Sequence, residues 1–233
     1  LKADDVTDFM LWGLPLSIIG ARLYYILFDL PQYLADPIQI FNIRSGGLAI
    51  YGGLIAGAIT LYFFTKYHFI SMWTFLDIAA PSVLLAQAIG RWGNFMNHEA
   101  YGPNTTRAFL ESLHIPQFII DNMYIEGIYR QPTFLYESMW SLIGFVLLLI
   151  LRNKKHLLKK GEVLLVYLMW YSFGRFFIEG LRTDSLYFLG VIRISQLLSA
   201  VLFIGTIILF IWRRKKENLP DYDRSLGKDQ FLI

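Results

Sequence analysis

The feature that most constrains this chain is its set of long apolar segments. A helix that crosses a membrane needs about 20 mostly apolar residues. Six stretches approach that description, at residues 9–28, 46–65, 73–96, 132–151, 162–180 and 191–212. Hydrophobic residues make up 55% of the chain and charged residues 17%, whereas soluble domains average about 25% charged residues. The sequence therefore predicts an all-α, polytopic transmembrane helix bundle. Residues 1–212 are expected to form one membrane-embedded domain, and 213–233 a basic, then polar, cytoplasmic tail.

The positions of the basic residues predict how this bundle is oriented. If the N-terminus is cytoplasmic, the segments on the cytoplasmic side hold most of the lysines and arginines. These are Lys2, Lys66, Arg152, Lys154, Lys155, Lys159, Lys160, Arg213, Arg214, Lys215, Lys216, Arg224 and Lys228. The outer loops hold Arg44, Arg107, Arg130, Arg182 and Arg193. Because cytoplasmic loops are enriched in lysine and arginine, this orientation is favoured. Glycines such as Gly53 and Gly57 are expected to permit close helix packing.

The run Gly90–Gly102 places polar groups at the outer end of the third span. Arg91 and Asn94 are three residues apart and can share a helical face. A planar guanidinium suits a phosphodiester. The alternative is an interfacial arginine that extends to lipid headgroups, with Glu99 a solvated acid.

Two more polar groups reach the outer ends of later spans. Tyr171, Arg175, Glu179 and Arg182 form one stripe on the fifth span. Its alternative reading is an Arg175–Glu179 pair that only stabilises the bundle. Glu137 lies one turn inside the fourth span, where a helix dipole alone would favour an acid.

All three groups reach the same depth on the same side, which predicts a cationic pocket for an anionic lipid headgroup. Charges inside a span persist when they pair, line a wet cavity or take part in chemistry. Asp77 is expected to be a structural partner of Arg22 or Arg91.

Composition argues against other classes of site. The chain has no cysteine, so disulfides and thiolate metal sites are excluded. Its histidines show no metal-ligand spacing. Its small net charge of +3 does not suggest binding to nucleic acid.

At these residues the chain resembles a known family. Gly90–Gly102 matches the signature of the prolipoprotein diacylglyceryl transferases, G-R-x-G-N-F-x-N-x-E-x-x-G, at every fixed position. Supporting stretches that resemble the family follow the same order: 20–23, 44–53, 131–137 and 175–182. The likeness extends from about Asp5 to Trp212.

The resemblance implies a reaction, its substrates and its residues. Such enzymes move the diacylglyceryl group of phosphatidylglycerol to the lipobox cysteine of a prolipoprotein signal peptide, the first step of lipoprotein maturation. They act at the outer face of the bacterial plasma membrane, without a metal or other cofactor. The implied catalytic residues are Arg91, Arg175, Glu99 and Glu179. The residues expected to bind phosphatidylglycerol are Arg91, Asn94, Asn97, Gly102, Arg182, Tyr171, Tyr51, Gln87, Tyr136 and Glu137.

The chain departs from the family pattern in two places. Tyr51 stands where many members carry histidine, and a tyrosine is a poor base at neutral pH. Either another group accepts the thiol proton, or no dedicated base is needed. Family members also usually begin with an additional membrane segment, which would raise the number of spans to seven.

Two other functions are compatible with charged spans. A transporter would spread polar residues across the depth of the membrane and show related halves with broken helices. A non-catalytic lipid-binding scaffold would explain the arginines, but gives no reason for Asn94, Glu99 and Glu179 to accompany them.

Overall fold

The computed structural model describes residues 3–43, 46–182, 187–188, 192–216 and 218–222. Within them nearly all regular structure is helical, and the strands are two-residue pieces in two antiparallel hairpins. The predicted all-α class is therefore confirmed. The chain folds as two units, an N-terminal unit (Leu1–Phe75 with Ser225–Ile233) and a bundle unit (Leu76–Arg224).

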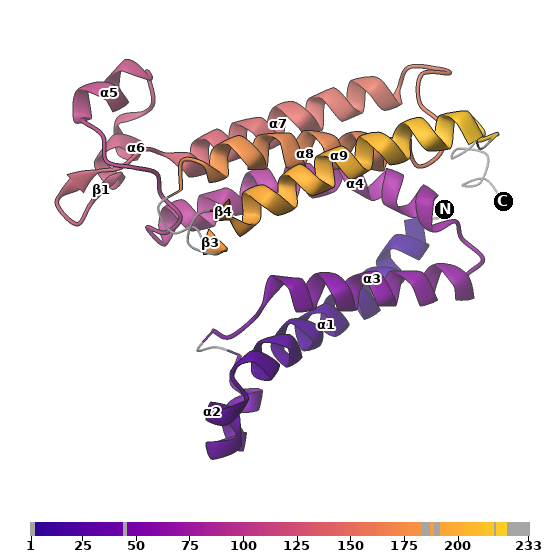
Figure 1. Cartoon of the computed structure of the whole chain (residues 1–233), viewed down its shortest axis with the longest axis horizontal. Helices are drawn as coiled ribbons and strands as arrows, with labels where there is room; N and C mark the ends of the chain where they lie inside the picture. The colour runs from indigo at the N-terminus through magenta and orange to yellow at the C-terminus, as the bar shows by residue number, and fades with distance from the viewer. Residues whose placement is uncertain (1–2, 44–45, 183–186, 189–191, 217, 223–233) are drawn as a thin grey trace. The chain divides into compact units, whose positions relative to one another are not determined.

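In the N-terminal unit, α1 (Ala3–Phe28) and α3 (Ile50–Tyr67) lie side by side (Figure 1). The chain between them forms α2 (Leu30–Ala35) and a 3-10 turn, η1 (Pro37–Phe41). The two helices touch at their small residues, because a Cβ on Gly52 would collide with the carbonyl oxygen of Gly20. A Cβ on Gly57 would lie 2.9 Å from Ser17 Oγ. The expected role of glycine in close helix packing is confirmed here.

Arg22 organises the connection between α1 and α3. Its buried guanidinium donates to the carbonyl oxygens of Ile40 and Asn42 at 3.0 Å, to that of Gly47 at 2.9 Å, and also to those of Gln39 and Gly46. Gly47 has a φ of 79°, in the left-handed region that glycine tolerates best. The expected pairing of Arg22 with Asp77 is therefore wrong, because backbone carbonyls satisfy this arginine instead.

The bundle unit contains four long helices and a small head. The helices are α4 (Met72–Met96), which begins in the N-terminal unit, α7 (Thr133–Arg152), α8 (Glu162–Glu179) and α9 (Ile194–Lys216). Figure 1 shows α7, α8 and α9 running along one another. A short hairpin of β3 (Tyr187–Phe188) and β4 (Ile192–Arg193) precedes α9.

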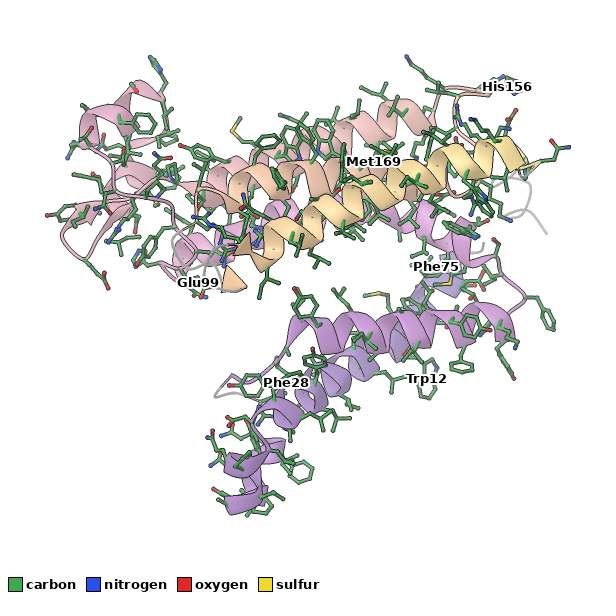
Figure 2. All side chains as sticks on the ribbon, viewed as in Figure 1. Trp12, Phe28, Phe75, Glu99, His156 and Met169 are labelled. Atoms are coloured by element: carbon green, nitrogen blue, oxygen red, sulfur yellow. The ribbon has the colours of Figure 1, made fainter. Side chains whose placement is uncertain are left out.

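The head comprises residues 97–132 and lies at one end of the bundle. It holds α5 (Arg107–Ser112), α6 (Gln117–Asn122) and a hairpin of β1 (Tyr124–Ile125) and β2 (Ile128–Tyr129). Its core joins Leu110, Ile119, Ile120 and Met123 to Phe95 of α4 and Phe134 of α7. The head is therefore packed onto the helix ends. Figure 2 shows Glu99 at this head end and His156 at the opposite end.

Two indole rings fasten α7 to α8. Trp140 Nε1 donates to the carbonyl oxygen of Trp170 at 3.0 Å, and Trp170 Nε1 donates to that of Trp140 at 3.0 Å. The rings stack with centroids 4.2 Å apart. Each indole occupies the space beside a glycine of the facing helix, Gly144 or Gly174.

We expect Gly174→Ala to destabilise the bundle, because the new Cβ would collide with the Trp140 indole. Overpacking of this kind costs about 1–3 kcal/mol. Thermal unfolding in detergent, followed by tryptophan fluorescence, measures the effect. Gly205→Ala on α9 is the matched control, since a Cβ there meets nothing within 4 Å. Equal unfolding temperatures for the two variants would contradict the packing described here.

Two buried carboxylates fix the start of α8 at the end opposite the head. Asp77 of α4 accepts hydrogen bonds from the backbone N–H groups of Gly161 (2.5 Å) and Leu164 (2.9 Å). Glu162 accepts from Lys159 N at 2.8 Å and holds the Arg214 guanidinium at 2.6 and 2.7 Å. Asp77 is thus structural, as expected, but its partners are backbone groups and not Arg91.

Part of the tail predicted at 213–233 is ordered. Arg213–Lys216 continue α9. Lys160 N donates to Pro220 O at 3.0 Å, and Tyr222 N donates to Leu158 O at 2.7 Å. These bonds attach residues 218–222 to the loop between α7 and α8. Residues 217 and 223–233 lie outside the described residues, as does residue 191 of the predicted last span.

The chain has the apolar helices of a membrane protein, and at least four of them are suited to crossing a bilayer. Among the described residues, Asp4–Phe28, Met72–Met96, Thr133–Arg152 and Ile194–Lys215 are long and apolar enough. Their apolar residues are largely exposed, as at Val201, Ile204 and Ile208 on α9. Such a surface is unusual for a soluble monomer. The predicted spans at 46–65 and 162–180 correspond to α3 and α8, which are helical but are not among these four. The span predicted at 46–65 begins later than expected, at Ile50, because Gly46 and Gly47 lie in the preceding loop.

Candidate functional site

The candidate site is an ion-pair cluster near the head end of the bundle. Arg91 comes from α4, Glu137 from α7, and Arg175 and Glu179 from α8. We call these four residues the arginine–glutamate cluster. Their side chains are 24%, 8%, 15% and 3% exposed, respectively. Buried charges of this kind need partners with good geometry, and here each arginine has a carboxylate partner.

Glu137 is the centre of the cluster. Its Oε2 forms an ion pair with Arg91 Nε at 2.8 Å, and its Oε1 accepts a hydrogen bond from Arg175 Nη1 at 3.0 Å. Arg175 Nη2 also forms an ion pair with Glu179 Oε2 at 2.6 Å, one helical turn along α8. One carboxylate therefore joins arginines from two helices, a role beyond that of a first-turn acid favoured by the helix dipole.

Hydrogen bonds between α7 and the α4 region fix the position of Glu137. The buried Thr133 Oγ1 donates to Ala100 O at 2.6 Å. Ser138 Oγ, next to Glu137 in sequence, donates to Ala88 O at 2.9 Å. These contacts hold the first turns of α7 against α4, so the Glu137 carboxylate lies between the two guanidinium groups.

The signature run forms the end of α4 and the loop after it. Arg91 Nη1 donates to Asn94 Oδ1 at 3.3 Å, and Asn94 Nδ2 donates to Glu99 Oε1 at 2.9 Å. Asn97 Nδ2 reaches the same Glu99 oxygen at 3.4 Å. Glu99, which the resemblance implied as a catalytic residue, is linked to Arg91 through Asn94.

Beside Glu99 lies a cavity of about 10 Å³ lined by Asn94, Glu99 and residues of the head. This cavity has room for about one water molecule.

Gly102 packs at the base of the head. Its N–H donates to Gln131 O at 3.0 Å, and a Cβ there would lie 2.9 Å from the Gln131 side chain. This position therefore requires a small residue.

Most of the remaining predicted residues lie near the cluster along the helices of the bundle unit. Gln87 is one turn from Arg91 on α4, and Tyr171 one turn from Arg175 on α8. Tyr136 precedes Glu137 on α7, and Arg182 follows α8, with its N–H on Glu179 O at 3.2 Å. Tyr51 lies in the first turn of α3, in the N-terminal unit.

Two residues at the site were not predicted. Arg193 of β4 donates to the carbonyl oxygen of Glu179, and no sequence pattern pointed to this contact. The hydroxyl of Tyr167 accepts a hydrogen bond from Gln87 Nε2 at 3.1 Å. Tyr167 extends the stripe of Tyr171, Arg175 and Glu179 by one more turn, so the same spacing argument would have found it.

The family model for prolipoprotein diacylglyceryl transferase matches residues 1–212. A phosphatidylglycerol–prolipoprotein diacylglyceryl transferase of Enterococcus faecalis is 66% identical over 228 residues, covering 98% of this chain and 82% of the relative. The chain belongs to the prolipoprotein diacylglyceryl transferase family.

Further relatives carry the same name. The protein of Pediococcus pentosaceus is 55% identical, with 95% of this chain and 80% of the relative covered. That of Limosilactobacillus reuteri is 55% identical, with coverage of 98% and 82%. The resemblance that the signature run Gly90–Gly102 indicated is confirmed. In this diacylglyceryl transferase family member, that run supplies Arg91 to the arginine–glutamate cluster and joins the head to the bundle.

Proposed function

We propose that this chain transfers the diacylglyceryl group of phosphatidylglycerol to the thiol of the lipobox cysteine of prolipoproteins. The family membership and the names of the relatives support the reaction class. The observation that carries the proposal at the level of residues is the convergence of two guanidinium groups on one buried carboxylate. This arrangement suits a lipid phosphate, because the cations are held in place before the anion arrives.

In the proposed reaction, the sulfur of the peptide attacks the glycerol carbon that is bonded to a phosphate oxygen. The new C–S bond is a thioether, the C–O bond breaks, and glycerol phosphate leaves with the bonding electrons. Negative charge grows on the leaving phosphate in the transition state. Arginine N–H donors that face this charge lower the barrier. Arg91 and Arg175 are the groups that we assign to this task, with Asn94, Asn97 and Arg182 assisting.

The carboxylates have a positioning role in this proposal. Glu137 engages Nε of Arg91, and Asn94 engages Nη1. Nη2 of Arg91 makes no hydrogen bond among the described residues and can face a phosphate. Glu179 holds the other arginine by Nη2, and Glu99 fixes Asn94. No dedicated base is required if the thiol releases its proton to water as the sulfur attacks. Tyr51, Tyr136 and Tyr171 are proposed to contact the lipid.

We further propose that α3 and α8 also cross the membrane, which gives six spans, and that residues 1–212 act as one domain. The head would then face the outside of the bacterial plasma membrane. The distribution of basic residues supports this orientation. The end opposite the head carries Lys154, Lys155, Lys159 and Lys160 together with Arg213–Lys216. Such a basic end is typical of the cytoplasmic side.

A transfer assay tests the proposed function. The protein is placed in liposomes that contain phosphatidylglycerol with labelled acyl chains, together with a lipoprotein signal peptide. A matched peptide carries serine in place of the lipobox cysteine. We expect label on the cysteine peptide alone, with one glycerol phosphate released per peptide modified. Binding of the lipid by folded protein without any transfer would contradict the proposal and favour the scaffold.

A further inference from the structure

The connection between α1 and α3 carries large apolar side chains that are exposed in the described structure. Leu34 of α2, and Ile38 and Phe41 of η1, are 70%, 78% and 85% exposed. They lie outside the predicted spans at 9–28 and 46–65. A cluster of exposed apolar side chains marks a surface that contacts a partner or a lipid.

The connection sorts its side chains into two faces. Residues three apart on a 3-10 helix lie one above the other, so Ile38 and Phe41 form an apolar row. Asp36, Gln39 and Asn42 form a polar row. Gln39 Nε2 donates to Asp36 Oδ2, and Asn42 Nδ2 donates to Gln39 Oε1, both at 3.3 Å. Such a two-faced pattern is typical of a segment that lies in the membrane interface.

The backbone of the connection is hydrogen-bonded from the protein side. The buried Arg22 guanidinium donates to the carbonyl oxygens of Gln39, Ile40 and Asn42. The N–H groups of Gln39 and Asn42 donate within the turns, at 3.2 and 3.1 Å. Arg22 also lies over the ring of Tyr33, a buried residue of α2, with Cζ 5.1 Å from the ring centroid. These backbone groups are therefore satisfied within the protein, as an apolar surrounding requires.

The exposed surface continues that of a helix suited to crossing a bilayer. α1 ends at Phe28, which is 77% exposed, and Figure 1 shows α2 directly beyond the end of α1. From residue 23 to residue 43 the charged residues are Asp29 and Asp36 alone. Attraction of lysine or arginine to anionic headgroups therefore cannot attach this stretch to a membrane. Burial of its apolar side chains can.

We propose that residues 28–43 form an interfacial segment that inserts Leu34, Ile38 and Phe41 among the acyl chains of one leaflet, just below the headgroups. In the orientation proposed above, this is the outer leaflet. The polar row lies at the level of the headgroups. The partner is the lipid surface itself, zwitterionic or anionic alike, because apolar burial holds the segment. The inference rests on α1 crossing the membrane and is independent of the transfer reaction.

A depth measurement tests the proposal. The chain has no cysteine, so the variants Ile38→Cys and Phe41→Cys each take one environment-sensitive NBD fluorophore. The full chain is placed in phosphatidylcholine nanodiscs, where both faces meet the solvent. Nitroxide lipids then report contact with lipid, and aqueous iodide reports contact with water. At both positions we expect blue-shifted emission and little quenching by iodide.

The depth of the nitroxide makes the expectation specific. Interfacial segments reach roughly 5–10 Å into the boundary between headgroups and acyl chains. A nitroxide near the ester should therefore quench both probes more strongly than one at the chain end. Replacing phosphatidylcholine with phosphatidylglycerol should leave the quenching unchanged.

Two further positions calibrate the measurement. A probe on Glu126→Cys, in the turn of the head hairpin with a side chain 76% exposed, should be quenched by iodide. A probe on Ile204→Cys, at the middle of α9 and 57% exposed, should be quenched most by the nitroxide at the chain end. Thermal unfolding of each labelled variant confirms that it is folded.

Two outcomes would overturn the proposal. If the probes at 38 and 41 are quenched by iodide as strongly as the probe at 126, the connection is a water-exposed loop. If neither iodide nor nitroxide lipid quenches them, protein covers the apolar row and lipid does not.

Discussion

Replacing Arg91 with glutamine is expected to lower kcat/KM for diacylglyceryl transfer by roughly 10²–10³-fold. Loss of one preorganised donor to a developing anion typically has an effect of this size. The protein should remain folded, because Glu137 keeps its hydrogen bond to Arg175 at 3.0 Å. Initial rates with labelled phosphatidylglycerol and the cysteine peptide measure the effect.

The control for this variant is Arg107→Gln in the head. Arg107 is half exposed and pairs with Glu111 at 2.8 Å on the same helix turn, and it contributes nothing to the cluster. Its replacement should leave transfer within about twofold of wild type, since surface pairs contribute little. If Arg91→Gln transfers at the wild-type rate, Arg91 has no part in the reaction. If it loses only affinity for the lipid, at unchanged kcat, the interaction is not specific to the transition state.

Replacing Glu137 with glutamine is expected to affect both stability and transfer. The change removes the negative charge that two largely buried guanidinium groups share. Breaking a buried ion pair by removing one partner costs about 3–5 kcal/mol. For a chain of this length we expect the unfolding temperature to fall by roughly 10 °C. Transfer should also fall, because Arg91 and Arg175 lose the group that fixes their positions.

Thermal unfolding in detergent and the transfer assay on the same preparation separate these two effects. Glu111→Gln in the head is the matched control, because its side chain is 52% exposed and pairs with Arg107. It should change stability by less than about 0.5 kcal/mol. An unchanged unfolding temperature for Glu137→Gln would show that its ion pairs do not support the bundle.

Part of the site was predictable because helical periodicity relates residues within one helix. The spacing of Arg175 and Glu179 placed them on one stripe and allowed them to pair, and the structure contains this pair. Arg91 and Asn94, three residues apart, are also joined. The common depth of three polar groups at span ends predicted that they meet. Apolar length likewise predicted the ranges of α4, α7 and α8 to within a residue or two.

Contacts between helices were not predictable, because they depend on how each helix is rotated and where it crosses its neighbours. Periodicity could not show that Glu137, rather than Glu99, lies between the two arginines. Asp77 binds backbone groups more than 80 residues away in sequence, at Gly161 and Leu164. Arg22 is satisfied by loop carbonyls, whose positions follow from turn geometry and have no sequence signature.

The central claim is that Arg91 and Arg175 act as one unit on the lipid phosphate, through the carboxylate of Glu137. The most direct test is a double-mutant cycle of Arg91→Gln and Arg175→Gln, with kcat/KM for transfer as the readout. Residues that act as a unit are strongly non-additive. We predict that each single variant loses most of the activity and that the double variant loses little more. Losses that multiply, or one single variant with wild-type activity, would contradict the claim.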